Sequence, residues 1–78
     1  GSAEKELRDL RRKFNSLTPR EVEVIKLVSK GLSNKEIAEA LNVALTTVKM
    51  HRGNAVDKLE VHSAAELTKA LVSLGEAL

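Results

Sequence analysis

The chain has 78 residues, a formal net charge of +2 and no cysteine. A chain of this length makes one domain, whose core is too small to enclose a sizeable substrate pocket. The absence of cysteine excludes disulfides and thiolate metal sites, and it suits a reducing cytoplasm. No apolar run approaches the roughly 20 residues that span a bilayer, and no signal-peptide pattern is present, so we expect no membrane partner.

Residues 1–16 are predicted to be a tag remnant followed by a linker helix. The opening Gly-Ser is typical of an expression tag, and a helix is expected over about residues 3–14. Leu7, Leu10, Phe14 and Leu17 follow a heptad-like spacing. We favour packing of this helix on its own domain through the last three of these residues. The alternatives are a coiled coil with a second copy and a linker continuing from a preceding domain.

Residues 17–78 are predicted to form an all-α domain of four helices, over about 19–30, 34–41, 45–59 and 64–74. Three helix starts carry a capping box, in which a hydroxyl caps the helix and a glutamate three residues later bonds back to the cap: Thr18 with Glu21, Ser33 with Glu36 and Ser63 with Glu66. Pro19 stands at the first helical position, where its missing N–H is not needed.

Apolar periodicity assigns a buried stripe to each of the four helices. The expected core residues are Val22, Ile25 and Val28 or Leu27, then Ile37, Ala38 and Leu41, then Val48, Ala55 and Leu59, and finally Leu67, Ala70, Leu71 and Leu74. We expect Gly31 to end the first of these helices and Asn42 to take a left-handed conformation after the second, which Asn tolerates better than most residues.

The helix expected over 45–59 carries the functional signal. Its exposed side holds Thr46, Lys49, Met50 and Gly53, followed by Asp57, and residues 40–56 contain no acidic residue. Glycine inside a helix lowers helix stability by about 1 kcal/mol relative to alanine. Gly53 therefore indicates either close approach of a second backbone or a position that needs no side chain. Two short helices joined by a tight turn, the second one basic, are typical of a unit that enters a DNA groove.

At this point several motifs resemble the LuxR/FixJ family of DNA-binding domains, over about residues 17–74. The matching segments are Leu17-Thr18-Pro19-Arg20-Glu21, Gly31-Leu32-Ser33-Asn34-Lys35-Glu36-Ile37-Ala38, Thr47-Val48-Lys49-Met50-His51 and Lys58-Leu59. The pair His51-Arg52 looks more like the FixJ-type branch, whose members follow a phosphorylated receiver domain. The resemblance implies a bacterial, cytoplasmic output domain of a two-component response regulator, in which receiver phosphorylation gates DNA binding.

The resemblance also implies roles for particular residues. The helix-turn-helix would comprise 34–41 and 45–59, with 45–59 as the recognition helix in the major groove. Together with the helical positions, it predicts DNA contacts from Thr46, Thr47, Lys49, Met50 and Asn54, and phosphate contacts from Lys35, Arg52 and Lys58. His51 would help to pack and position the helix.

The helix over 64–74 would be the dimerisation helix. Its weaker second stripe of Ala65, Thr68 and Val72 predicts a homodimer that reads an inverted repeat in double-stranded DNA. RNA polymerase is open as a further partner.

Three residues depart from the family pattern. Ala44 stands where a serine often caps the recognition helix, which costs roughly 1 kcal/mol of capping. Gly53 replaces a residue that often projects toward the bases, so base reading is expected to be narrower. Glu60 stands where a turn-forming Gly or Asn is common, which predicts strain in the link to the last helix.

Two other binding functions fit the pattern less well. A helical protein-interaction module would use residues 3–14 as a coiled-coil seam and dock the basic face on an acidic partner. A sigma-factor-like promoter-reading domain has a similar helix pair. Nothing indicates an enzyme, a cofactor or a metal site, because the two histidines adjoin no nucleophile motif and too few ligands are present for zinc. Phe14 is the only aromatic residue, which disfavours base stacking on single strands.

Overall fold

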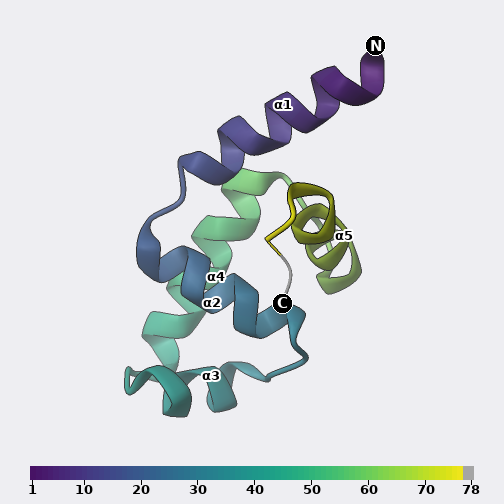
Figure 1. The fold of residues 1–78 in the computed structure, drawn as a ribbon. Helices are drawn as coiled ribbons and strands as arrows, with labels where there is room; N and C mark the ends of the chain where they lie inside the picture. Colours follow the sequence, from purple (N-terminus) through teal and green to yellow (C-terminus); the bar gives the residue numbers. More distant parts are fainter. Residues whose placement is uncertain (77–78) are drawn as a thin grey trace.

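The computed structural model describes residues 1–76, in which five helices follow one another (Figure 1). They are α1 (Ser2–Asn15), α2 (Pro19–Ser29), α3 (Asn34–Leu41), α4 (Leu45–Leu59) and α5 (Ala64–Leu74). The described residues contain no strand, so the expected all-α fold is confirmed. Within residues 1–76 no helix combines the length and the apolar character needed to cross a membrane.

The core lies where α4 packs against α2, α3 and α1 and where α5 packs against α2 and α1. Ile25, Ile37, Val48, Ala55 and Leu71 are fully buried there. The stripes predicted for α4 and α5 are confirmed in full, because all seven of their residues are buried.

The stripe predicted for α2 needs a correction. Val24 is fully buried although it was not expected in the core, while Val22 and Leu27 are only partly buried against it. The cause is the central position of α2, which packs against α3, α4 and α5. A helix covered on several sides buries a wider arc than the single stripe of a surface helix.

Helix α1 packs on the domain by its C-terminal end. Phe14 is buried in the core, and Leu10 and Leu17 pack against it, whereas Leu7 is exposed. The N-terminal turns of α1 project beyond the other helices (Figure 1), which makes the molecule 42 Å long against 20 and 19 Å in the other directions. The described structure therefore agrees with packing of this helix on its own domain.

The capping boxes of α2 and α3 form as predicted, and that of α5 differs in one bond. Thr18 and Ser33 each accept the N–H of the glutamate three residues later, whose carboxylate accepts the N–H of the cap. Ser63 caps α5 by accepting the N–H of Glu66, but the Glu66 carboxylate accepts the His62 N–H at 2.6 Å instead. The glutamate thus fixes the turn one residue before the cap.

Two turns place a side-chain-bearing residue in the left-handed region. Asn42 ends α3 with φ 56° and ψ 48°, which confirms the expectation for this residue. Glu60 ends α4 with φ 56° and ψ 42°, a conformation that is unfavourable for a residue with a Cβ. The Glu60 carboxylate forms an ion pair with Lys13 of α1, and the Lys13 ammonium lowers the pKa of Glu60 below its ordinary value. This pair ties the end of α4 to α1.

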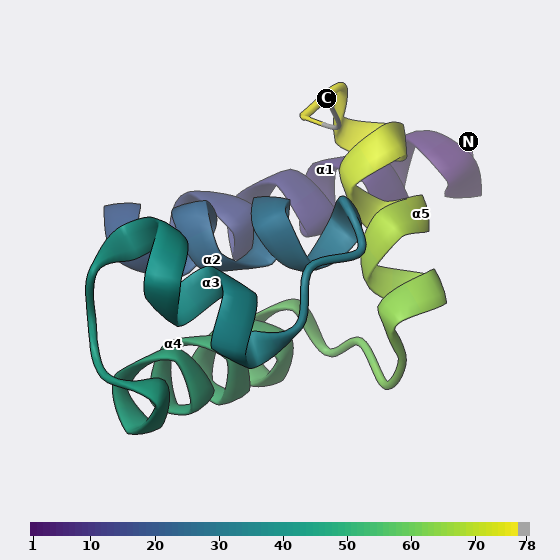
Figure 2. The same cartoon turned by 90° about the horizontal axis from the view of Figure 1, so that it is seen from below.

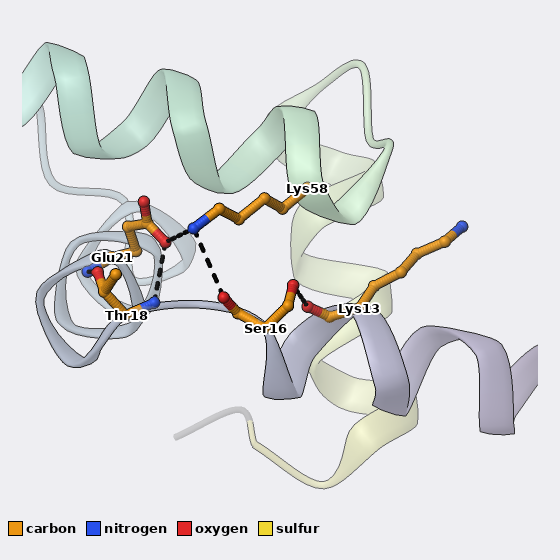
Figure 3. Close-up of polar contacts among 5 residues, drawn as sticks. All are labelled: Lys13, Ser16, Thr18, Glu21 and Lys58. Atoms are coloured by element: carbon orange, nitrogen blue, oxygen red, sulfur yellow. Dashed lines mark hydrogen bonds and ion pairs between the residues drawn. The ribbon is translucent and has the colours of Figure 1, made fainter.

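A buried carboxylate also joins α4 to the start of α2 (Figure 3). Glu21 is only 3% exposed, and its Oε1 accepts hydrogen bonds from Lys58 Nζ at 2.7 Å and from the Thr18 N–H at 2.9 Å. Lys58 Nζ also lies 3.5 Å from the carbonyl oxygen of Ser16. A buried charge is stable only when it is paired and hydrogen-bonded, and Glu21 meets both conditions.

Ala44 is the N-cap of α4. Among the N-caps of the four helices α2 to α5, it is the one without a side-chain hydrogen bond. Its φ of −69° and ψ of 151° resemble those of Ser33, so a serine at position 44 would fit the same geometry. We expect Ala44→Ser to raise the free energy of unfolding by about 1 kcal/mol. Urea unfolding followed by circular dichroism measures this change. Ala40→Ser, at an exposed position in the last turn of α3, is the control and should not stabilise the domain. Equal effects of the two substitutions would contradict the capping argument.

Lys58 lowers the pKa of Glu21 below its ordinary value of 4.5, burial opposes this effect, and the Thr18 N–H adds to it. Below pH 4.5 the unfolded chain therefore binds more protons at this site than the folded one. The stabilisation by ionised Glu21 is complete above that pH and is lost as the pH falls through the folded value.

Lys58→Met should consequently lower the free energy of unfolding at neutral pH by about 1–3 kcal/mol, because it leaves a buried carboxylate without its main partner. The difference from the wild type should shrink as the pH falls below 4.5 and through the lowered pKa of folded Glu21, because the carboxylate then becomes protonated in both proteins. Urea unfolding at several pH values tests this. Lys69→Met, at an exposed position of α5, is the matched control. A difference between Lys58→Met and wild type that stays constant with pH would contradict the assignment.

Candidate nucleic-acid interface

Helices α3 and α4 form the predicted helix-turn-helix. Figure 2 shows α4 at one edge of the molecule, with α3 beside its N-terminal half and the other helices to one side of it. Asn42 reverses the chain between them, and its left-handed conformation keeps the connection short. The buried stripe of Val48, Ala55 and Leu59 turns the opposite side of α4 outward.

The outward side of α4 holds the residues that the sequence predicts for base contact. Thr46 and Lys49 are exposed, and Met50 is 54% exposed, which is unusual for a large apolar side chain. A Cβ placed on Gly53 would meet no atom within 4 Å among the described residues. No described segment of this chain therefore approaches this glycine closely, which leaves either the backbone of a bound partner or a position that needs no side chain.

The remaining predicted contacts on α4 lie on its flanks. Helical geometry places Thr47 and Asn54 about 80–100° from Thr46 on one side, and Arg52 and Lys58 about 120° away on opposite sides. Asn54 is exposed and Thr47 is half-buried. Thr47 and Asn54 border the outward face, whereas Arg52 and Lys58 lie closer to the helices that pack against α4.

Both flanking cations already have partners within the domain. Arg52 Nη1 donates a hydrogen bond of 2.8 Å to Asn34 Oδ1, at the start of α3. Lys58 pairs with buried Glu21. By contrast, Lys35 at the start of α3 is exposed, next to the capped N-terminus of that helix. The structure thus brings Thr46, Lys49 and Met50 together on one surface and assigns internal contacts to Arg52 and Lys58.

The N-terminal half of the outward face is cationic because it lacks acidic residues, and not because it holds many basic ones. Residues 40–56 contain no Asp or Glu, and the next acid on α4 is exposed Asp57, near its C-terminal end. The negative charge therefore increases toward the C-terminal end of α4. A polyanion is favoured at the N-terminal half, where the helix dipole is also positive.

Two polar contacts at this interface were missed in the sequence. Glu21 was assigned only a capping role, although it is also the partner of Lys58, and Asn34 was not assigned any role. Each pair joins residues that are far apart in the chain, by 37 and 18 positions. No local pattern marks either pair, because the two partners of each pair lie on different helices.

The predicted dimer surface on α5 is accessible. Ala65 is exposed, Thr68 is half-buried and Val72 is 61% exposed, on the side of α5 away from the core residues Leu67 and Leu71. Small residues around one exposed valine leave room for close approach of a second helix.

Comparisons with known proteins agree with this geometry. Residues 15–71 match the family model GerE, described as bacterial regulatory proteins, luxR family. The chain is 46% identical over 56 residues to the tetrathionate response regulatory protein TtrR of Salmonella typhimurium, covering 72% of this chain and 27% of that protein. It is 40% identical over 73 residues to nodulation protein W of Bradyrhizobium diazoefficiens, covering 94% of this chain and 32% of that protein.

A solved structure of the response regulator StyR is also similar. The two superpose with a TM-score of 0.86 at 42% identity, over 91% of this chain and 36% of the StyR chain. The chain thus spans well under half the length of each of these relatives. The family match covers α2, both helices of the helix-turn-helix, and α5 as far as residue 71. The chain belongs to the luxR family of bacterial regulatory proteins, as their helix-turn-helix DNA-binding domain.

Proposed function

We propose that this domain reads a specific sequence in double-stranded DNA by placing the N-terminal half of α4 in the major groove. The observation that carries the proposal is the exposed, acid-free surface of Thr46, Lys49 and Met50 on a helix whose opposite side is held in the core. Lys49 is suited to donate to guanine O6 and N7, and Met50 to contact a thymine methyl group. Thr46, Thr47 and Asn54 border these contacts and reach base edges or phosphates.

Phosphate contacts would fix the register of the domain on the duplex. Lys35 and the backbone N–H groups at the start of α3 are the best placed, because a helix N-terminus attracts phosphate. Lys58 is a weaker candidate than the sequence indicated, since a phosphate would have to compete with buried Glu21 for its ammonium. Because Lys58 lies near the surface, its positive charge still contributes to the long-range attraction of DNA.

The relatives support a place for this domain in a larger protein. TtrR and StyR are described as response regulators, and the chain corresponds to about a third of their length. We propose that it is the output domain of a bacterial response regulator, that it works in the cytoplasm where DNA is present, and that phosphorylation of a receiver domain gates its binding. RNA polymerase would be a further partner if the domain activates transcription.

Selection of duplexes from a random pool, followed by titration of the winner against a scrambled duplex, tests the function. The affinity should fall steeply with salt, with a slope of about −0.9 in log–log form for each phosphate contact. Lys49→Ala should cost about 1–3 kcal/mol on the selected duplex and relax specificity at one position. Lys5→Ala, on the projecting part of α1, should have a far smaller effect.

Two outcomes would count against these assignments. If the folded domain bound no duplex even at low salt, the proposed function would fail. If Lys49→Ala left the ratio of selected to scrambled affinity unchanged, Lys49 would not read a base.

We further propose that two copies pair through Ala65, Thr68 and Val72 of α5 when they occupy an inverted repeat. Val72→Glu should leave the affinity for a duplex with one half-site unchanged and reduce the cooperative gain on two half-sites by about tenfold, or 1.4 kcal/mol. Gel-shift titration of both duplexes measures the two quantities. Ser73→Glu adds the same charge at the next exposed position and should keep cooperativity. Equal losses of cooperativity in Val72→Glu and Ser73→Glu would show that the two copies do not pair through this surface.

A further inference from the structure

The hydrogen bond between Arg52 and Asn34 joins the two helices of the helix-turn-helix. Arg52 Nη1 donates to Asn34 Oδ1 at 2.8 Å, and both residues are half-buried. Asn34 is the first residue of α3, while Arg52 lies at the middle of α4. The bond therefore crosses from the end of one helix to the centre of the other.

The position of Arg52 also brings it near α5. Arg52 lines a small hollow together with Val56 of α4 and with Ser63 and Ala64 at the start of α5. Its side chain thus lies near the starts of both α3 and α5, on the flank of α4 that is turned away from Thr46 and Asn54. This placement differs from that of Lys49, which is exposed on the outward face.

Few apolar side chains of α3 are buried. Helix α3 has eight residues and buries two of them, Ile37 and Ala38, in the same core as Val48 of α4, while Leu41 is partly buried against this core. Apolar burial is non-directional, so it restrains the relative register of the two helices less sharply than a directional bond does. A hydrogen bond to a guanidinium is directional and stronger than one between neutral groups.

We propose that Arg52 is a positioning residue, which acts through Asn34 to fix α4 relative to α3, rather than one of the phosphate contacts predicted from the sequence. The proposal rests on the proposed function, since it concerns how the reading surface of α4 is aligned with the phosphate-binding start of α3. Base readout needs both surfaces in one register, whereas non-specific attraction to the duplex does not.

The two roles predict different measurements. A lost phosphate contact weakens binding to all sequences alike and lowers the magnitude of the salt slope by about 0.9. A lost positioning contact leaves that slope unchanged and lowers the ratio of selected to scrambled affinity. In the second case, removal of Asn34 must reproduce the effect of removing Arg52, although Asn34 carries no charge.

The experiment compares the wild type with Arg52→Gln, Asn34→Ala and the double variant, on the selected and the scrambled duplex across a series of salt concentrations. We expect each single variant to lose about tenfold in the affinity ratio, and the double variant to lose no more than either, as for two residues that act through one contact. Arg52→Lys, which keeps a charged donor but not the guanidinium geometry, should recover only part of the ratio. Lys35→Ala serves as the control for a phosphate contact and should reduce the slope.

The outcomes separate the alternatives. A reduced slope and uniform weakening in Arg52→Gln, with Asn34→Ala silent, would overturn the proposal and restore the phosphate contact. If Arg52→Gln fails to fold by circular dichroism, Asn34→Ala decides alone: an unchanged affinity ratio overturns the proposal, and a reduced ratio at unchanged slope supports it. Failure of the proposed function is distinct, because the wild type would then prefer no duplex.

Discussion

The structure depends on the burial of one stripe of α4. Val48, Ala55 and Leu59 pack against the surrounding helices, and helical periodicity then leaves the opposite face without a partner inside the described domain. The same three side chains that complete the core thus decide which residues face outward. Since a core of this size is closely packed, the outward surface is presented on a rigid support and needs little ordering when it binds.

Polar contacts add directional restraints to the apolar packing of α4. Near its C-terminal end α4 is tied to the start of α2 by Lys58 and Glu21, and to α1 by Glu60 and Lys13. In its middle it is tied to α3 by Arg52. Because hydrogen bonds to charged groups are directional, these bonds add to the packing of the buried stripe in fixing the rotation and register of α4. The lysine and arginine residues of α4 therefore divide into two groups: Arg52 and Lys58 hold the helix in place, and Lys49 stays exposed.

Much of the fold followed from local patterns. Hydroxyl caps with a glutamate three residues later located the starts of α2 and α3, and Asn42 marked the left-handed turn, because capping and turn chemistry depend on neighbours in the chain. The stripes of α4 and α5 followed from helical periodicity for the same reason. The α2 stripe was less complete: Val24 was missed because its burial depends on how many helices surround α2, which no local period records.

The sequence by itself determined that the chain is all-helical, where its helices begin, which face of α4 points outward and which family it belongs to. All of these properties are set within about one or two helical turns, or by motifs in a fixed order. Only the tertiary structure decided which cations have internal partners. In the sequence Arg52 and Lys58 look like Lys35 and Lys49, because a charged side chain carries no record of its partner. Asn34 and Glu21 reach them only when α3 and α2 fold against α4, across separations of 18 and 37 residues.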